Sequence, residues 1–240
     1  MNRLTRKNLA ALSADDKRLL DDVIGAPRKV DARTDLIREG DAPDNVHLIL
    51  DGFACRYKLT SEGERQIMAY LVPGDFCDLH VAILKRMDHG IATLSPCRVV
   101  EIPFARIDEL TARPAIARAL WWATLVDEAV LREWLVNIGR REAPQALAHL
   151  LAELLFRLRA VGLAEGDSYE LPLTQQELGD TLGLSTVHVN RSLHVLRTEN
   201  LITLKNKSVT ILDTESLFEF SGFNANYLHL LGKQSTAASN

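Results

Sequence analysis

Cysteine is scarce in this 240-residue sequence, which holds only Cys55, Cys77 and Cys97 and no C-x-x-C pair. Their spacing argues against a zinc ribbon or a thioredoxin-like site. An odd number of isolated cysteines, without an export signal, is typical of reduced thiols in a cytosol. We therefore expect a cytoplasmic protein in which these three residues belong to the core.

Long apolar runs and an excess of positive charge are also missing. No stretch is apolar for about 18 residues, so no transmembrane helix is expected, and the start MNRLTRKNLAALSADD has no apolar signal-peptide core. The formal net charge is -4, which argues against a purely electrostatic nucleic-acid binder. A sequence-specific reader stays possible, because a small basic face can sit on an acidic body.

Enzyme motifs are absent as well. No Walker loop, Ser-His-Asp set or paired-carboxylate motif stands out. His47, His80 and His89 are scattered in the sequence without an H-x-H pair, whereas a metal-dependent cupin needs clustered histidines. We predict no catalytic residues, no metal site and no enzymatic activity, with a cupin-like enzyme as the remote alternative.

Two kinds of hydrophobic pattern fill the first 140 residues. Residues 3–25 favour a helix that starts near Ser13. From 28 to 103, short apolar runs of period two alternate with turns such as Gly40-Asp41, Asp51-Gly52 and Pro73-Gly74. Many short strands with regular turns predict an antiparallel sandwich or barrel.

A long helix is predicted after Arg113-Pro114, because apolar residues there follow three- and four-residue steps. The apolar arc is wide, which favours a second surface for another copy of the chain, although packing against the chain's own barrel is compatible. Gly139 fits a left-handed cap, Pro144 fits the start of the next helix, and residues 139–143 are interpreted as a hinge. The predicted dimerisation residues are Ile116, Leu120, Trp121, Ala123, Asp127, Leu131 and Trp134.

The stretch LTQQELGDTLGLSTVHVNRSLHVLR, residues 173–197, predicts two short helices joined by a tight turn. Thr174 and Glu177 form a capping box for the first, which ends at Gly183, and Ser185 caps the second. Such a pair is the signature of a helix-turn-helix. A helical hairpin with ordinary polar residues on its exposed face is the alternative.

The free face of the second helix carries the chemistry of base recognition. If Val189, Leu193 and Leu196 point inward, the N-terminal turn of the helix faces outward. Arg can donate two hydrogen bonds to guanine, Asn can pair with adenine, and Val can contact a thymine methyl. The predicted DNA contacts on the two helices are Thr174, Gln175, Ser185, Thr186, Val187, His188, Asn190 and Arg191.

The sequence LITLKNKSVTILD then predicts a strand, a turn and a strand, that is, a wing with Lys205 and Lys207 at its tip. These lysines can neutralise phosphates, unless they belong to an ordinary solvated turn. Residues 140–212 contain eight Lys and Arg against eight Asp and Glu. Binding must then depend on how charges are arranged, which favours two half-sites.

The order of these parts resembles the Crp/Fnr family of bacterial transcription factors. The resemblance rests on DLIREGDAPDNVHLILDGFACRYKLTSEGERQIMAYLVPGDF, on the long helix and on the helix-turn-helix stretch. It implies an α+β fold with an antiparallel double-stranded β-helix of the cyclic-nucleotide-binding type (a jelly roll), a dimerisation helix and a winged helix-turn-helix. The expected parts are a sensor domain with its N-terminal helix (1–112), a dimerisation helix (113–138), a hinge (139–143), a DNA-binding domain (144–220) and a tail (221–240).

The resemblance also implies a homodimer that binds palindromic promoter DNA and contacts RNA polymerase. Arg191 matches the family arginine that reads guanine. Many relatives have Glu where this chain has Val187, so the half-site should differ elsewhere. The signal in the β-roll, whether a small molecule or a redox change, is not identified by the sequence.

Departures from the family pattern concern that signal. Relatives that bind cyclic AMP carry a Gly-Glu pair after the Gly-Asp-Phe turn and a later Arg-Ser pair, but Asp78-Leu79 and Met87-Asp88 stand there. This argues against cyclic AMP, although a cyclic-nucleotide-responsive regulator remains the alternative. The lack of cysteines before Cys55 argues against an iron–sulfur cluster, and haem held by His80, His89 or Cys77 stays open. The candidate effector-pocket residues are Asp75, Phe76, Cys77, Asp78, Leu79, Arg86 and Asp88.

Overall fold

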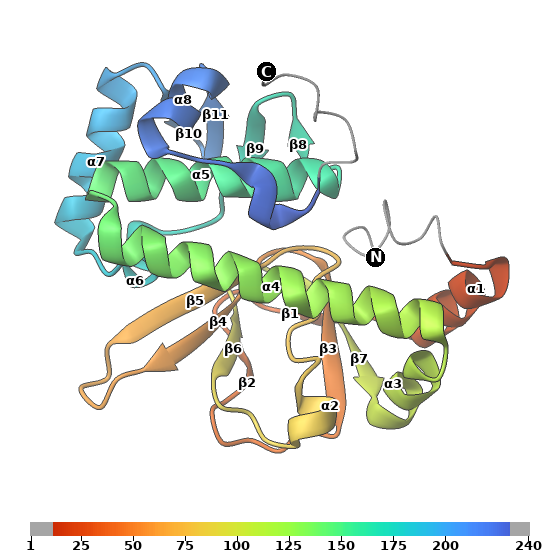
Figure 1. The fold of residues 1–240 in the computed structure, drawn as a ribbon. Helices are drawn as coiled ribbons and strands as arrows, with labels where there is room; N and C mark the ends of the chain where they lie inside the picture. Colours follow the sequence, from red (N-terminus) through yellow and green to blue (C-terminus); the bar gives the residue numbers. More distant parts are fainter. Residues whose placement is uncertain (1–11, 231–240) are drawn as a thin grey trace.

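Short strands form the first half of the chain in the computed structural model, which describes residues 12–230. The predicted strand-rich region forms two antiparallel sheets that face each other as a β-roll, with strand orders β1-β7-β3 and β2-β6-β4-β5 (Figure 1). Both inner faces are lined by buried aliphatic and aromatic residues, as expected for a jelly roll. The strands are β1 (Arg28–Val30), β2 (Asp35–Ile37), β3 (Asn45–Asp51), β4 (Ala54–Leu59), β5 (Arg65–Leu71), β6 (Gly90–Thr93) and β7 (Cys97–Pro103).

The turn between β3 and β4 requires its glycine. Gly52 has a φ of +83°, and a Cβ there would lie 2.2 Å from the carbonyl oxygen of Pro96. Only glycine accommodates both the positive φ and this close approach. The Asp51-Gly52 turn predicted from the sequence is thus fixed by the neighbouring chain.

Short helices close the open ends of the β-roll. Helix α1 (Ala14–Val23) starts at the expected residue, because the Ser13 side chain accepts a hydrogen bond from Asp16 N and a capping box forms. The remainder of the helix predicted over 3–25 lies partly outside the described residues, as does the end of the 221–240 tail. Helices α2 (Val81–Leu84) and α3 (Phe104–Thr111) were not predicted.

The long helix α4 (Pro114–Arg140) lies along one side of the roll, and in the view of Figure 1 it runs between the roll and α5. It runs through Gly139, so the predicted left-handed cap at this glycine is wrong. The helical break is confined to Arg141 and Glu142, both of which have extended backbone angles. Helix α5 (Ala143–Ala160) follows at once, with Pro144 in its first turn as expected.

The break between α4 and α5 is held by side chains. Asn137 Nδ2 donates to Ala146 O at 3.0 Å, and Arg141 donates to Glu133 Oε1 at 2.7 Å and to Ser221 O at 3.1 Å. These contacts explain why the chain needs no glycine to end α4. They also join the two helices across the region that the sequence suggested as a hinge.

The remaining elements form the C-terminal domain. Its sheet has the order β10-β11-β9-β8, two strands more than the predicted wing. The elements are β8 (Ala164–Glu165), β9 (Ser168–Glu170), α6 (Gln175–Leu182), α7 (Thr186–Thr198), β10 (Ile202–Lys205), β11 (Ser208–Ile211), α8 (Thr214–Ser221) and the 3-10 helix η2 (Ala225–Leu228).

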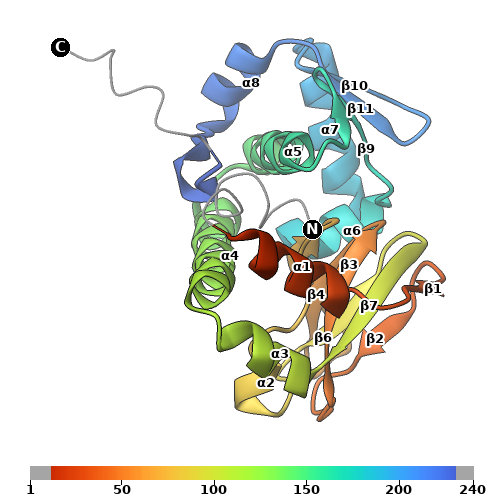
Figure 2. The same cartoon turned by 90° about the vertical axis from the view of Figure 1, so that its right-hand side faces the viewer.

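One hydrophobic core joins the two halves of the molecule. It runs from the β-roll through α4 and α5 to the C-terminal domain, and the rings of Tyr70 and Trp134 meet edge to face at 5.5 Å within it. In the view of Figure 2, α6 lies between the C-terminal domain and the strands of the roll. No helix within residues 12–230 has the length and apolar character needed to cross a membrane.

Candidate nucleic-acid interface and ligand pocket

Helix α6 is built by the capping signals that the sequence predicts. The Thr174 side chain accepts a hydrogen bond from Glu177 N, and Glu177 Oε2 accepts one from Thr174 N at 2.6 Å. The helix ends at Gly183, whose φ is +66°. Gly179 permits the turn that follows, because a Cβ there would lie 2.4 Å from the carbonyl oxygen of Leu184.

Helix α7 buries one face and exposes the other, as predicted. Ser185 caps it and accepts a hydrogen bond from His188 N. Val189, Leu193 and Leu196 are buried in the core of the domain. On the opposite side His188, Asn190 and Arg191 are exposed, Thr186 is half-buried, and the Val187 side chain is 56% exposed.

Asn190 has a partner that the sequence did not reveal. Its amide and that of Gln175 exchange two hydrogen bonds, Asn190 Nδ2 to Gln175 Oε1 at 2.6 Å and Gln175 Nε2 to Asn190 Oδ1 at 2.8 Å. This pair ties the start of α6 to α7. The Asn190 amide therefore braces the two helices in this conformation, and would have to release Gln175 before it paired with a base.

The wing is a two-residue hairpin. Lys205 pairs with Ser208 across the strands, and both loop residues, Asn206 and Lys207, have positive φ, as the primed hairpin turns require. Lys205 and Lys207 are exposed on either side of Asn206. Their ammonium groups are available to an external phosphate.

Helix α6 also docks on strand β5 of the β-roll. Arg65 contacts Asp180 at 2.8 Å, Gln66 Nε2 donates to Thr181 O at 3.1 Å, and the Tyr70 hydroxyl lies 2.5 Å from Thr181 Oγ1. The C-terminal domain is thus fastened to the β-roll through α6, the first helix of the helix-turn-helix. Nothing in the sequence patterns pairs these distant segments.

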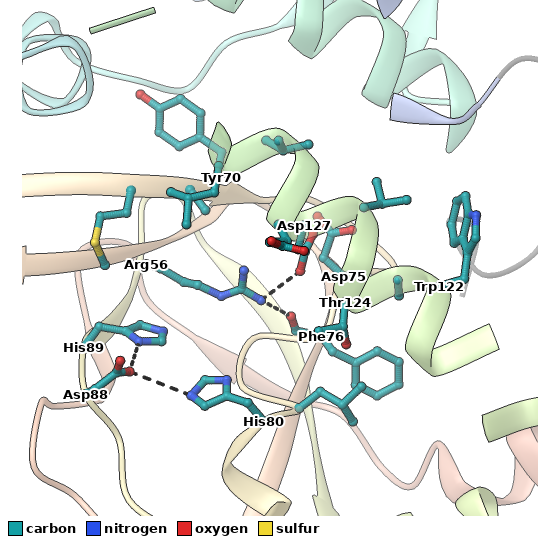
Figure 3. Close-up of a pocket in the computed structure, with 18 of the residues that line it drawn as sticks. Arg56, Tyr70, Asp75, Phe76, His80, Asp88, His89, Trp122, Thr124 and Asp127 are labelled. Carbon is teal, nitrogen blue, oxygen red and sulfur yellow. Dashed lines mark hydrogen bonds and ion pairs between the residues drawn. The ribbon is translucent and has the colours of Figure 1, made fainter. Parts of the chain in front are cut away.

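A pocket of about 460 Å³ lies between the β-roll and α4 (Figure 3). Four of the predicted effector-pocket residues line it, namely Asp75, Phe76, Leu79 and Asp88. These residues belong to the turn after β5 and to the loop before β6, and the opposite wall of the pocket is formed by α4.

The other three predicted pocket residues have different surroundings. Asp78 is fully buried and accepts from His47 N at 2.7 Å and from the His47 ring at 2.8 Å, so it fastens β3 to the loop after β5. Cys77 is buried and Arg86 is exposed, and neither lines the pocket. A sequence offset from the family pattern does not fix the direction in which each of these side chains points.

Arg56 is the central pocket residue that the sequence analysis missed. It extends from β4 and donates to Cys77 O at 2.8 Å and Phe76 O at 2.9 Å, and its guanidinium also contacts Asp127 of α4 at 3.1 Å (Figure 3). Asp127 therefore binds the chain's own β-roll. Arg56 couples the floor of the pocket to the long helix.

A buried polar network lies behind the pocket. Arg157 of α5 contacts Asp75 Oδ2 at 3.0 Å, Tyr70 O at 2.6 Å and Glu153 Oε1 at 3.1 Å. The other oxygen of Glu153 accepts from Trp134 Nε1 at 3.0 Å and from the Tyr227 hydroxyl at 2.9 Å. The network joins the β-roll, both long helices and the end of the C-terminal domain.

Two of the histidines that are scattered in the sequence meet at one end of the pocket. The rings of His80 and His89 stack with centroids 5.3 Å apart, and Asp88 Oδ1 lies 2.6 Å from His89 Nδ1 and 4.0 Å from His80 Nε2. Burial lowers the pKa of both imidazoles. They meet because the loop between α2 and β6, which carries His89, folds back toward His80 at the start of α2.

The three thiols are free and buried, as predicted. Burial raises the pKa of Cys55 to about 12 and that of Cys97 to about 11, and it raises the pKa of Cys77 for the same reason. Because the thiolate is the reactive form, these residues are poor redox sensors.

The predicted dimerisation stripe on α4 needs correction. Ile116, Leu120 and Trp134 are buried in the chain's own core, and Ala123 and Asp127 line the pocket. The alternative, packing against the chain's own barrel, holds for this half of the arc. Exposed apolar side chains form the other half: Trp121, Leu125, Leu131, Leu135, Val136 and Ile138.

Comparisons with known proteins agree with this architecture. Residues 27–113 match the cyclic nucleotide-binding domain family, and residues 145–220 match the Crp-like helix-turn-helix domain family. The structure is similar to that of FixK2 from Bradyrhizobium japonicum, with a TM-score of 0.71 and 21% identity, over 81% of this chain and 96% of FixK2.

Two transcriptional activators are similar in sequence along most of their length. FnrL of Cereibacter sphaeroides is 30% identical, over 81% of this chain and 80% of FnrL. Anr of Pseudomonas protegens is 27% identical, over 88% of this chain and 87% of Anr. The sensor roll, the long helix and the winged helix-turn-helix occur here in the same order, and the chain therefore belongs to the Crp/Fnr family of transcriptional regulators.

Proposed function

We propose that two copies of this chain bind a palindromic promoter site, each placing the N-terminal turn of α7 in the major groove. The supporting observation is the division of α7, with a buried apolar face and an opposite face that carries Val187 and Arg191. Arg191 reads a guanine, and Val187 contacts a thymine methyl in place of the glutamate of many relatives. Lys205 and Lys207 of the wing hold the phosphate backbone.

The second copy binds along α4. Its six exposed apolar residues run from Trp121 to Ile138, and one of them, Leu131, also lies at the edge of the pocket. Such a row of side chains is unfavourable in water without a partner. The charges of the DNA-binding domain also favour a dimer. One neutral domain has little affinity for DNA by itself, and two domains on one site bind more tightly. Half-sites are then separated by about one helical turn, ~34 Å.

The pocket receives the signal that controls DNA binding. Two ion pairs join the pocket to the helices that lead to the helix-turn-helix. Arg56 pairs with Asp127 of α4, and Asp75 pairs with Arg157 of α5. A ligand that favours one arrangement of these groups shifts the docking of α6 on β5, and this changes the position of α7. Lining carboxylates such as Asp88 and Glu128 would repel a cyclic phosphate, so cyclic AMP is disfavoured.

The protein acts in the cytoplasm on genomic DNA and contacts RNA polymerase at the promoter, as a regulator without catalytic activity. The relatives that are named as transcriptional activators support this role. The cupin-like alternative has no support beyond the β-roll.

Selection of bound DNA from a random pool by the purified full-length protein tests the proposal. We expect an inverted repeat with a guanine in each half-site, and no change when cyclic AMP is added. The Arg191→Ala variant is the matched control and should lose preference at that guanine. Recovery of random DNA, or of an asymmetric site, would contradict a dimer that reads bases through α7.

A further inference from the structure

We propose that His80, Asp88 and His89 bind a divalent transition-metal ion at the outer end of the pocket, with Zn²⁺ and Fe²⁺ as the best-fitting ions. One ligand atom from each side chain lies within 4.8 Å of the other two, and no other such cluster of three His, Cys or carboxylate donors occurs within residues 12–230. Two imidazoles and one carboxylate are a donor set for these ions. The metal site is argued independently of the proposed function. The further idea that the ion is the signal that controls DNA binding rests on that proposed function.

The ring nitrogens supply the first argument. The Nε2 atoms of His80 and His89 are both buried, and neither has a hydrogen-bond partner among the described residues. A buried polar atom left in this way costs about 1–3 kcal/mol. Coordination to an ion satisfies such an atom, whereas the aliphatic and aromatic neighbours in the pocket cannot.

The geometry requires only a small adjustment. Around a tetrahedral ion with bonds of about 2.0–2.2 Å, neighbouring ligand atoms lie roughly 3.3 Å apart. The Asp88 carboxylate already lies between the two rings, 2.6 Å from His89 Nδ1 and 4.0 Å from His80 Nε2 (Figure 3). The Asp88 side chain is 81% exposed on the loop between α2 and β6, so its carboxylate is free to turn and bring both ring nitrogens to coordination distance of one ion.

Local charge does not oppose a cation. Three cationic side chains line the pocket, Arg56, Lys58 and Arg157. Each is paired with a carboxylate: Arg56 with Asp127 at 3.1 Å, Lys58 with Glu39 at 3.1 Å and Arg157 with Asp75 at 3.0 Å. These carboxylates offset the positive charges that line the pocket. Asp88 adds a negative charge directly beside the two histidine rings.

The position of the three ligands would allow a bound ion to affect the contact between the β-roll and α4. The pocket that it borders is also lined by Arg56 and by Asp127 of α4. A bound dication would repel the Arg56 guanidinium and attract the Asp127 carboxylate, and it would thereby change the balance of the Arg56–Asp127 pair that joins the roll to the long helix. The remaining coordination positions open toward the pocket, where water or a small anion can complete the shell.

Titration of untagged full-length protein with Co²⁺ alone is the direct test, because a histidine tag would add its own site. We expect a visible d–d absorption band at one equivalent, which Zn²⁺ abolishes by displacement. His80→Gln, His89→Gln and the exposed Asp88→Asn should each weaken binding more than about tenfold. His229→Gln, which changes an exposed histidine outside the pocket, should bind as the wild type does.

Two results would overturn the site. The first is wild-type affinity in Asp88→Asn and in the His80→Gln/His89→Gln double variant. The second is no Co²⁺ binding below millimolar concentration. Since Asp88 is exposed, its variant folds and decides the matter even if a histidine variant does not. DNA binding is measured separately with and without Zn²⁺: if DNA is bound but Zn²⁺ has no effect, the ion is not the signal, and if no DNA is bound, the proposed function itself fails.

Discussion

The guanidinium of Arg157 in α5 contacts the carboxylate of Asp75 in the turn after β5 at 3.0 Å, with both side chains almost fully buried. The two residues are 82 positions apart in the sequence. Through this ion pair and the neighbouring Glu153, the sensor roll and the DNA-binding domain share one buried charge network. The stability of each half therefore depends on the other.

Loss of Arg157 should destabilise the whole protein. Arg157→Met leaves the carboxylates of Asp75 and Glu153 buried without their cation, which costs about 3–5 kcal/mol. Urea unfolding measures this free energy. Arg159→Met is the matched control, because the Arg159–Asp167 pair is exposed and contributes less than about 1 kcal/mol. Equal effects of the two substitutions would contradict the network's role.

Substitutions of Arg191 and Lys207 should affect DNA binding in different ways. Arg191→Ala should lose roughly 1–3 kcal/mol of binding free energy on the selected site and relax one base position. Lys207→Ala should weaken binding to all sequences alike and lower the salt slope by about 1. Binding measured at several salt concentrations on specific and random DNA separates the two. Identical behaviour of both variants would show that the assigned roles are wrong.

A charge on the exposed side of α4 should separate the dimer without unfolding the chain. The Leu135 side chain is 66% exposed, so Leu135→Asp should raise the dimer dissociation constant at least about tenfold, as measured by sedimentation or light scattering. Leu163→Asp, at an exposed leucine after α5, is the matched control. Trp134 is unsuitable for this test, because it is buried and bonded to Glu153. A dimer that survives Leu135→Asp unchanged would place the interface elsewhere.

Acid should destabilise the protein in part through His149. Burial lowers the pKa of His149 from 6.5 to about 3, even though Glu133 Oε1 lies 3.2 Å away; that oxygen already accepts a hydrogen bond from Arg141. The unfolded chain thus binds a proton that the folded chain does not, and the stability present above pH ~6.5 is lost as the pH falls toward ~3.

The expected loss from His149 alone is about 2 kcal/mol between pH 7.5 and 5. Urea unfolding across this range should give a shallower dependence for His149→Phe than for the wild type. His229→Gln, at an exposed position, should keep the wild-type dependence. The same pH slope in wild type and His149→Phe would exclude His149 as a source of the acid sensitivity.

Local signals were sufficient to predict the helix-turn-helix, although they missed α2, α3 and two strands of the C-terminal sheet. The capping box of Thr174 and Glu177, the cap at Ser185 and the inward set around Val189 depend on neighbours within a few residues, and the structure has them as predicted. Gly139 shows the limit of such signals. Its sequence context fits a helix cap, but Asn137 and Arg141 make tertiary hydrogen bonds that carry α4 one residue past it.

The sequence by itself determined the order of the domains, the alternation that makes a β-roll and the face of α7 that stays free, because each follows from periodicity along one segment. Only the tertiary structure decided which half of α4 is exposed, that Arg56 and Asp127 meet, and that His80 and His89 stack. These contacts join segments whose separation is set by the packing of whole sheets and helices, and no local pattern encodes the direction in which such side chains finally point.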